Sequence, residues 1–301
     1  MTAGGSGARW LVTVFCLALL GGCSVKLAYN NLDRLARWSL SDYIALDSRQ
    51  RAYFDAAFAE VWAWHRQAHL PQYADFLESL GPRLVDGSSE AQMAAMVEQV
   101  LGWAGEIEAR AMPLTTRLLA SLSDQQVADL ASNLEAGNIE TAAPEADVTL
   151  AEAQALWQEE LTDRFTSFSG RLNSLQTAYL AEQSRRYRPD RVLWAEYRRR
   201  WQQDLLALLA FRSDVDAFAR GFEQLAANRE LYYGSEFASA FEANQALTRE
   251  ASIWLLNSLT DQQRARFVDR LDSLAADLRA LATDRGRGRV SDAELPCLLE
   301  C

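Results

Sequence analysis

Residues 118–126, Leu-Leu-Ala-Ser-Leu-Ser-Asp-Gln-Gln, recur almost unchanged at residues 255–263 as Leu-Leu-Asn-Ser-Leu-Thr-Asp-Gln-Gln. In each copy a hydroxyl residue, Ser123 or Thr260, stands three positions before a glutamine. This spacing is typical of a capping box. The hydroxyl accepts a hydrogen bond from the first helical turn, and the glutamine side chain accepts one from the capping residue. An apolar helical pattern precedes each copy, so each copy predicts a corner between two helices.

A third and weaker copy, Leu46-Asp47-Ser48-Arg49-Gln50, lies nearer the start of the chain. The unequal spacing of the copies argues against a regular solenoid, whose units recur at a fixed period. It favours duplication of a helical hairpin. We therefore expect two related helical halves.

Composition and apolar spacing both predict a helical protein. The chain of 301 residues is rich in good helix formers and has only six prolines. Apolar side chains follow the helical period, and no segment alternates with the period of two typical of a strand, so we predict an all-α bundle of about ten helices. Pro71 is expected to end one helix and begin the next, and Pro113 to kink or split a later one. The expected helices span residues 47–69, 71–80, 89–119, 123–134, 150–168, 174–186, 190–211, 215–227, 235–257 and 261–283.

Residues 137–149 lack a helical period and contain Pro144, so we expect a linker there. This linker would separate an N-terminal helical half, residues 23–136, from a C-terminal half, residues 150–283. An arginine–glycine run predicts a flexible tail over residues 284–301.

The first 22 residues have the layout of a secretion signal. Arg9 precedes the apolar run Trp10 to Leu20, which is shorter than the roughly 20 residues of a membrane-spanning helix. The sequence Leu20-Gly21-Gly22-Cys23 resembles the bacterial lipobox. The resemblance implies cleavage before Cys23 and acylation of its thiol, and several acyl chains hold a protein firmly to a membrane. Ser24, in place of aspartate, favours the outer membrane with the protein facing the periplasm. An ordinary secretion signal with a coincidental cysteine is the alternative.

Further motifs resemble the opening of an uncharacterised family of proteobacterial lipoproteins of unknown function. They are Tyr29-Asn30-x-x-Asp33, Leu46-Asp47-x-x-Gln50, Trp64-His65-Arg66 and Leu70-Pro71-x-Tyr73. This resemblance implies a lipoprotein with a helical body and supplies no activity. Residues 259–263, Leu-Thr-x-x-Gln, also resemble a motif of small periplasmic helical chaperones of the Spy and CpxP type, which are shorter and not lipid-anchored.

The formal net charge of −11 argues against binding to nucleic acid and against general binding to anionic lipid. The sequence has no phosphate-binding glycine loop after a strand, no G-x-S-x-G motif and no H-E-x-x-H motif. We therefore expect no enzymatic activity and no cofactor. The alternative is a hydrolase whose catalytic Asp and Glu residues are not identified by any sequence motif. The leading hypothesis is a non-catalytic binding or chaperone-like module. It is anchored to the outer membrane through Cys23, and its partner is an envelope protein or an unfolded client.

His65 and His69 are the only histidines, and their spacing allows two imidazoles on one helix to share a metal. Arg66 stands where zinc proteases place a glutamate, and a third ligand would come from Asp75 or Glu78. Metal binding or sensing is thus the alternative function. The competing interpretation places the His65 ring in the core and His69 in the last turn of its helix, where positive charge is favourable. We prefer it, because a zinc site needs at least three protein ligands.

Arg185, Arg186, Arg188 and Arg191 form a basic segment in this acidic chain. Arginine side chains suit phosphate and carboxylate groups, so these four are candidate ligands for an anionic headgroup or partner. Ion pairs with the protein's own carboxylates are the preferred interpretation.

The chain has four cysteines. Cys16 would leave with the signal and Cys23 would carry lipid, which leaves Cys297 and Cys301. Because they stand four apart, they are a candidate disulfide in an oxidising periplasm. Two reduced thiols on a frayed end are the alternative.

Overall fold

The computed structural model of the protein describes residues 22–83, 87–284, 295, 297 and 298. Within these residues the chain forms eleven α-helices, one short 3-10 helix and no strand, which confirms the predicted all-α class. The helices are α2 (Gly22–Tyr29), α3 (Leu32–Ser41), α4 (Ser48–Arg83), α5 (Glu90–Ala120), α6 (Asp124–Ala146), α7 (Leu150–Ser169), α8 (Ser174–Ser184), α9 (Arg191–Leu209), α10 (Val215–Ala227), η2 (Arg229–Tyr232), α11 (Ser235–Asn257) and α12 (Asp261–Thr283).

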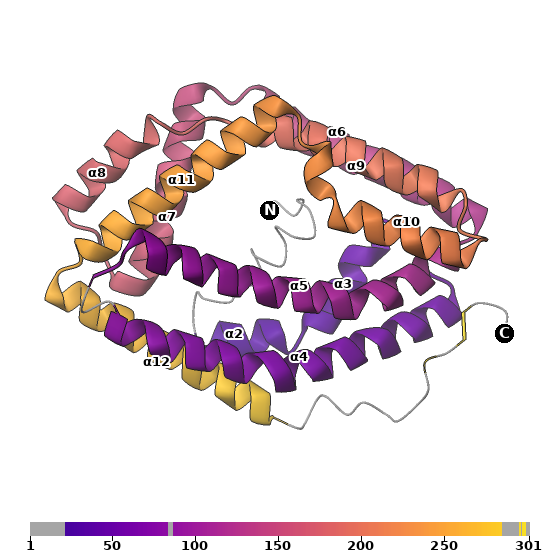
Figure 1. Ribbon diagram of the computed structural model, residues 1–301, viewed down its shortest axis with the longest axis horizontal. Helices are drawn as coiled ribbons and strands as arrows, with labels where there is room; N and C mark the ends of the chain where they lie inside the picture. Colours follow the sequence, from indigo (N-terminus) through magenta and orange to yellow (C-terminus); the bar gives the residue numbers. More distant parts are fainter. Residues whose placement is uncertain (1–21, 84–86, 285–294, 296, 299–301) are drawn as a thin grey trace.

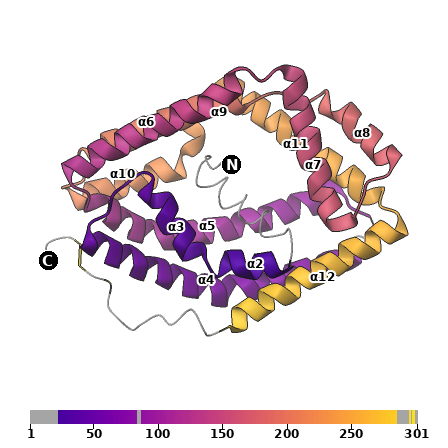
Figure 2. The ribbon, with the colours of Figure 1, turned by 180° about the vertical axis from the view of Figure 1, so that it is seen from behind.

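The helices form an elongated, closed frame (Figure 1). One long side consists of α4, α5 and α12, and the opposite side consists of α6, α9 and α10, with α7, α8 and α11 completing the frame. The last helix, α12, packs along α4 and so joins the C-terminal part of the chain to the N-terminal part. Seen from behind, α2 and α3 lie in front of α4 and α5 (Figure 2).

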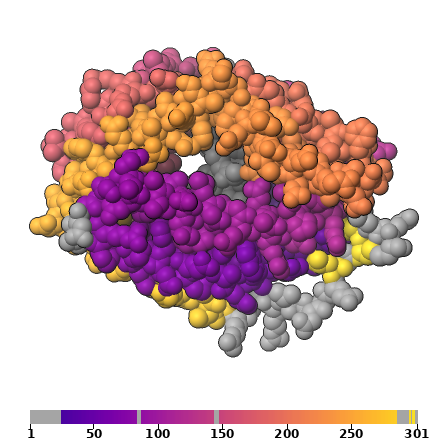
Figure 3. Space-filling view, viewed as in Figure 1, coloured from indigo at the N-terminus to yellow at the C-terminus, as the bar shows by residue number. Residues whose placement is uncertain are grey.

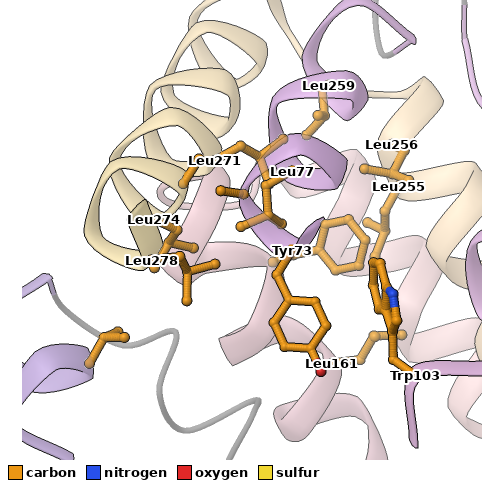
Figure 4. Packing of buried hydrophobic residues seen from close by; sticks show 14 of the residues in the cluster. Tyr73, Leu77, Trp103, Leu161, Leu255, Leu256, Leu259, Leu271, Leu274 and Leu278 are labelled. Carbon is orange, nitrogen blue, oxygen red and sulfur yellow. The ribbon is translucent and has the colours of Figure 1, made fainter. Parts of the chain in front are cut away.

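Two hydrophobic clusters hold the frame together. The first joins α2, α4, α5, α7, α8, α11 and α12, and Leu77 lies beside Leu271 and Leu274 in it (Figure 4). The second joins α4, α5, α6, α9 and α10 around Tyr53 and Phe218. Each cluster contains residues from both sides of residues 137–149, so packing links the two expected halves across that segment.

Side-chain caps set many of the helix boundaries. Ser89, Thr149 and Thr260 each form a full capping box at the start of α5, α7 and α12. Helices α10, α11 and α12 begin and end at the residues that the sequence predicts. A cap is a local hydrogen bond between neighbours in the chain, and for this reason it can be recognised without tertiary structure.

The predicted break at Pro71 is wrong, because α4 continues through it to Arg83. A proline inside a helix costs about 3 kcal/mol. Leu70, Tyr73 and Leu77 are buried on the same helix, and each large apolar side chain contributes about 1.5–3 kcal/mol when buried. Packing around Pro71 therefore outweighs the local penalty. Pro113 likewise lies inside the continuous helix α5.

Most of the segment predicted as a linker is also helical, because α6 extends to Ala146 and only residues 147–149 separate it from α7. Asn138 is buried and donates a hydrogen bond from Nδ2 to Oε1 of Gln202 in α9 at 2.7 Å. The Thr141 hydroxyl donates to the carbonyl of Gly137 at 2.6 Å. Contact with α9 thus supports a stretch whose own pattern is weak.

The repeated corners are joined in pairs through their glutamines. In the first glutamine pair, Nε2 of Gln50 donates to Oε1 of Gln126 at 3.1 Å, and Gln126 donates back at 2.6 Å. Gln50 also donates to the carbonyl of Ser121 at 2.9 Å, and Gln126 to that of Ala45 at 2.8 Å. These bonds fix the start of α4 to the corner between α5 and α6.

The second glutamine pair repeats this arrangement. Gln176 and Gln263 exchange side-chain hydrogen bonds of 3.0 and 2.9 Å. Gln176 donates to the carbonyl of Ser258 at 3.1 Å, and Gln263 to that of Arg171 at 3.0 Å. The segment Leu172-Asn173-Ser174-Leu175-Gln176 is thus a fourth copy of the corner motif, with asparagine as the cap. The sequence pattern missed it because the hydroxyl is replaced, although asparagine caps helices equally well.

Candidate functional site

Helix α5 is long and mostly exposed, since only four of its 31 residues are buried. Met93 and Val100 pack against the first hydrophobic cluster. Val97 stands four residues after Met93 and Leu101 four residues after Val97, so these two side chains adjoin the packed ones, and they are 46% and 64% exposed. We call these two residues the apolar stripe of α5. A single exposed apolar side chain is ordinary, whereas two that adjoin on one helix are a candidate contact for an apolar partner.

Two ion pairs lie at the ends of this stripe. Arg249 of α11 pairs with Glu90, and Arg229 of η2 pairs with Glu108. The positions 90, 97, 101 and 108 are spaced seven, four and seven apart, which places them on one side of the helix. The stripe therefore faces the same side as the two contacts that α5 makes with α11 and η2.

Gly105 stands one turn after Leu101 and so lies beside the stripe. Among the described residues, a Cβ atom added at Gly105 would meet no other atom within 4 Å. The space-filling view shows the surface hollowed between α5 and α11 (Figure 3). With no side chain at Gly105, an apolar segment of another molecule could approach the backbone of α5 closely there.

His65 and His69 belong to a histidine–tyrosine network that also contains Tyr29, Tyr73 and Glu106. The Tyr29 hydroxyl lies 3.0 Å from Nδ1 of His65. The Tyr73 hydroxyl lies 3.3 Å both from Nε2 of His65 and from Nδ1 of His69. Nε2 of His69 lies 2.9 Å from Oε2 of Glu106. All four ring nitrogens therefore have a hydrogen-bonding partner within the protein.

Burial controls the charge of this network. Burial, together with repulsion from His69 and Arg66, lowers the pKa of His65 to about 3, so its ring is neutral at pH 7. Burial also raises the pKa of Tyr29 and of Tyr73. The His65 ring stacks on Trp62 with centroids 5.6 Å apart.

His69 is fully buried and lies in the middle of α4. The expectation of a helix end there is wrong, because α4 continues past Pro71.

The two carboxylates expected as a third metal ligand face another partner. Arg279 of α12 pairs with Asp75 and with Glu78, each at 2.7 Å. In the part of the chain that the structure describes, no group of three or more His, Cys, Asp or Glu residues is placed to hold a metal ion. The two histidines of the metal-binding hypothesis lie close together, but Asp75 and Glu78, the residues expected to supply a third ligand, pair with Arg279 instead. Metal binding stays a prediction.

The basic segment lies at the end of α8 and the start of α9, and carboxylates accompany much of it. The ion pairs are Arg185–Glu182 at 2.6 Å, Arg186–Glu250 at 2.9 Å and Arg191–Glu160 at 3.3 Å. The Arg188 guanidinium lies 3.4 Å from the hydroxyl of Ser239. An anionic ligand would have to compete with these partners, so anion binding here also stays a prediction.

The cysteine predictions fall largely outside the described residues. Position 23 lies in the first turn of α2. Cys297 is exposed, and its carbonyl accepts a hydrogen bond from Arg49 at 3.0 Å. Cys301 lies outside the described residues, so the expected disulfide has no structural description. Leu298 of the predicted tail packs against the second hydrophobic cluster.

Sequence reasoning missed the apolar stripe of α5 and the tyrosines of the network. Val97 and Leu101 adjoin Met93 and Val100 on the helix, so spacing alone did not distinguish the two exposed side chains from the two that pack against the core. Tyr73 stands four residues after His69, which places it on the same side of α4.

The Leu-Thr-x-x-Gln likeness has a structural explanation in this chain. Gln126 and Gln263 are the glutamines of the two copies, and each is held in a glutamine pair between helix corners. The motif therefore stabilises corners here.

The sequence profile of a family of unknown function, DUF6279, matches residues 42–238, which is more than half of the chain. No curated protein and no solved structure matches the chain. No helix in the described ranges is both long and apolar enough to cross a bilayer.

Proposed function

The chain belongs to this family of unknown function, DUF6279, and we propose that it is a non-catalytic lipoprotein that binds an apolar segment of an envelope protein. Its lipid is attached at Cys23, and its body faces the periplasm from the outer membrane. The apolar stripe of α5 is the contact surface.

Two observations support a lipid anchor at Cys23: the Leu-Gly-Gly-Cys motif and the packing of α2 against the hydrophobic core. Val25 and Tyr29 of α2 are buried in the first hydrophobic cluster. Acyl chains on position 23 would thus be connected to the core through a single turn of helix. Several acyl chains give stable attachment, whereas one gives only marginal binding.

The observation that carries the binding function is the position of the apolar stripe. Val97 and Leu101 are exposed on the side of α5 where ion pairs to α11 and η2 keep the neighbouring elements in place. A partner that covered both side chains would remove their remaining apolar surface from water. Because each is about half covered already, each would contribute roughly half of the ~1.5–3 kcal/mol of a fully buried side chain. This surface suits an extended or helical segment with apolar side chains on one face.

The binding function is tested by placing a photoreactive amino acid at position 101 in intact cells. We expect a crosslink to a defined envelope protein, and we expect Val97→Glu to reduce it at least five-fold. The matched control places the same group at Leu175 of α8, which is 66% exposed. Equal crosslinking from positions 101 and 175, or no effect of Val97→Glu, would contradict the proposal.

The chaperone-like form of the function has its own test. The lipid-free protein is expected to suppress aggregation of an unfolded client at substoichiometric amounts. Val97→Glu together with Leu101→Glu is expected to abolish the effect, and Leu175→Glu together with Val192→Glu to preserve it.

The anchor is tested by mass spectrometry and membrane fractionation. We expect a mature chain that begins at an acylated Cys23, and a Cys23→Ala variant that no longer sediments with outer membranes. Retention of residues 1–22 in the mature protein would overturn the anchor.

A further inference from the structure

Helix α2 buries one side and exposes the other. Val25 and Tyr29 are buried, whereas Leu27 between them is 66% exposed. Position 23 stands one turn before Leu27 on this helix, so the two positions share a side. Four residues of α-helix rise about 6 Å, which places Leu27 within about 6 Å of the position that carries the lipid.

Helix α3 has the same arrangement over its full length. Leu32 and Leu40 pack against the two hydrophobic clusters. Arg34, Arg37 and Trp38 are exposed and stand at positions i, i+3 and i+4, which is one side of a helix. The helix has no buried residue, so it lies on the surface of the molecule.

Helices α2 and α3 both pack against α4. Tyr29 of α2 stacks on Trp62 of α4 with centroids 3.8 Å apart, and Arg37 of α3 pairs with Asp55 of α4 at 2.7 Å. Both helices lie in front of α4 and α5 in Figure 2. We call the exposed residues Leu27, Arg34 and Trp38 of these two neighbouring helices the anchor-side surface.

The chemistry of the anchor-side surface fits the interface of a lipid bilayer. Tryptophan is enriched at the level of the lipid headgroups, because its ring is apolar and its N–H is polar. Arginine buries its aliphatic stem and keeps its guanidinium near phosphate groups. Of the cations in residues 22–41, Lys26 pairs with Asp277 of α12 and Arg37 pairs with Asp55 of α4, each at 2.7 Å, so carboxylates of the protein balance their charges. Arg34 is exposed beside Trp38 and is the arginine of this surface that a headgroup phosphate would meet.

We propose that the anchor-side surface lies in the headgroup layer of the bilayer that holds the lipid on Cys23, with Leu27 and Trp38 inserted into it. The inference rests on the proposed lipid anchor. Amphipathic segments of this kind insert about 5–10 Å into the interface, a depth that Leu27 can reach from position 23. The contact fixes the orientation of the frame, with α2 and α3 next to the membrane.

The test uses the lipidated full-length protein, reconstituted in vesicles of phosphatidylethanolamine and phosphatidylglycerol whose acyl chains are brominated near the headgroup. Bromine quenches tryptophan at short range. Trp38 is the exposed tryptophan of the described residues. We expect brominated lipid to quench the wild-type fluorescence, and Trp38→Phe to remove at least half of that quenching. The control, Trp254→Phe, changes a half-buried ring stacked on Tyr179 and is expected to leave the quenching unchanged.

The outcomes separate this inference from the anchor itself. Protein that fails to float with the vesicles would overturn the lipid anchor and, with it, this inference. Protein that floats normally but shows no quenching, or the same quenching in Trp38→Phe, would overturn the anchor-side surface alone. A Leu27→Glu variant that floats normally is expected to show at least two-fold weaker quenching, and undiminished quenching in it would also overturn the proposal.

Discussion

The two glutamine pairs and the histidine–tyrosine network both satisfy buried polar groups, but they do so with different chemistry. Each glutamine pair joins two helix corners with neutral amides. The network joins α2, α4 and α5 through groups that can change charge. The stabilisation from the glutamine pairs should therefore be constant over a wide pH range, whereas the stabilisation from the network should decrease in acid.

The two glutamine pairs also differ from each other, in how deeply their side chains are buried. Both members of the second pair are buried, Gln176 fully and Gln263 at 6% exposed, whereas in the first pair Gln50 is buried and Gln126 is half-buried. A buried polar group that loses its partner cannot be rescued by water, which makes the loss expensive. The same motif should therefore contribute more stability in the second pair than in the first.

Gln176→Leu is expected to have the largest effect. It removes the bonds that Gln176 makes to Gln263 and to the carbonyl of Ser258, although Gln263 keeps its bond to the carbonyl of Arg171. One unsatisfied buried group costs about 1–3 kcal/mol. We expect a loss of about 3 kcal/mol in the free energy of unfolding, measured by urea denaturation. Gln262→Leu, at the exposed neighbour of Gln263, is the control and should change stability by less than about 0.5 kcal/mol. Equal losses in both variants would refute the structural role of the second pair.

Lowering the pH from 7 to 5 is expected to cost about 2 kcal/mol through His65. The pKa of His65 is about 3 in the folded protein, and we take the ordinary histidine pKa of 6.5 for the unfolded chain. As the pH falls through 6.5, the unfolded chain takes up a proton that the folded protein cannot accept. Stability is therefore lost between pH 6.5 and 3. Urea denaturation at several pH values measures this slope.

His65→Gln provides the control for this pH dependence. The variant should show a much smaller loss between pH 7 and 5, whatever its stability at pH 7. The same slope in the variant and the wild type would show that other groups are responsible. Variants of the glutamine pairs should keep the wild-type slope, because amides do not titrate.

Gln126→Ala is expected to cost about 1–1.5 kcal/mol, less than the change at Gln176. Water can reach this half-buried side chain and replace part of the lost bonding. Gln125→Ala is the matched control, since the Gln125 side chain donates to Asp129 on the exposed surface of α6. A loss as large as that of Gln176→Leu would remove the proposed difference between the pairs.

Glu106→Gln is expected to have the smallest effect, below about 0.5 kcal/mol. The Glu106 side chain is 58% exposed, so solvent screens its charge, and the amide oxygen of glutamine can still accept from His69. The melting temperature should shift by less than about 2 °C. A shift of more than about 5 °C would mean that the charge of Glu106 supports the network.

Local signals in the sequence predicted much of the helical architecture. The capping boxes at Ser89, Thr149 and Thr260 are hydrogen bonds between residues three apart, and they set the starts of α5, α7 and α12. The predictions failed where packing opposed a local preference, as at Pro71 and in the second half of α6. The lipobox resemblance at Cys23 is also a local pattern, and it stays a prediction.

Apart from the false start at Pro71, the chain alone therefore determined where helices α4 to α12 begin, because caps and apolar periods depend on neighbours a few residues apart. Only the tertiary structure could decide which corners meet, since the glutamine pairs join residues 76 and 87 positions apart. It also decided that His65 and His69 bond to tyrosines and that Val97 and Leu101 stay exposed. The physical reason is that burial depends on how α4, α5, α11 and α12 pack together, and no short-range pattern specifies that packing.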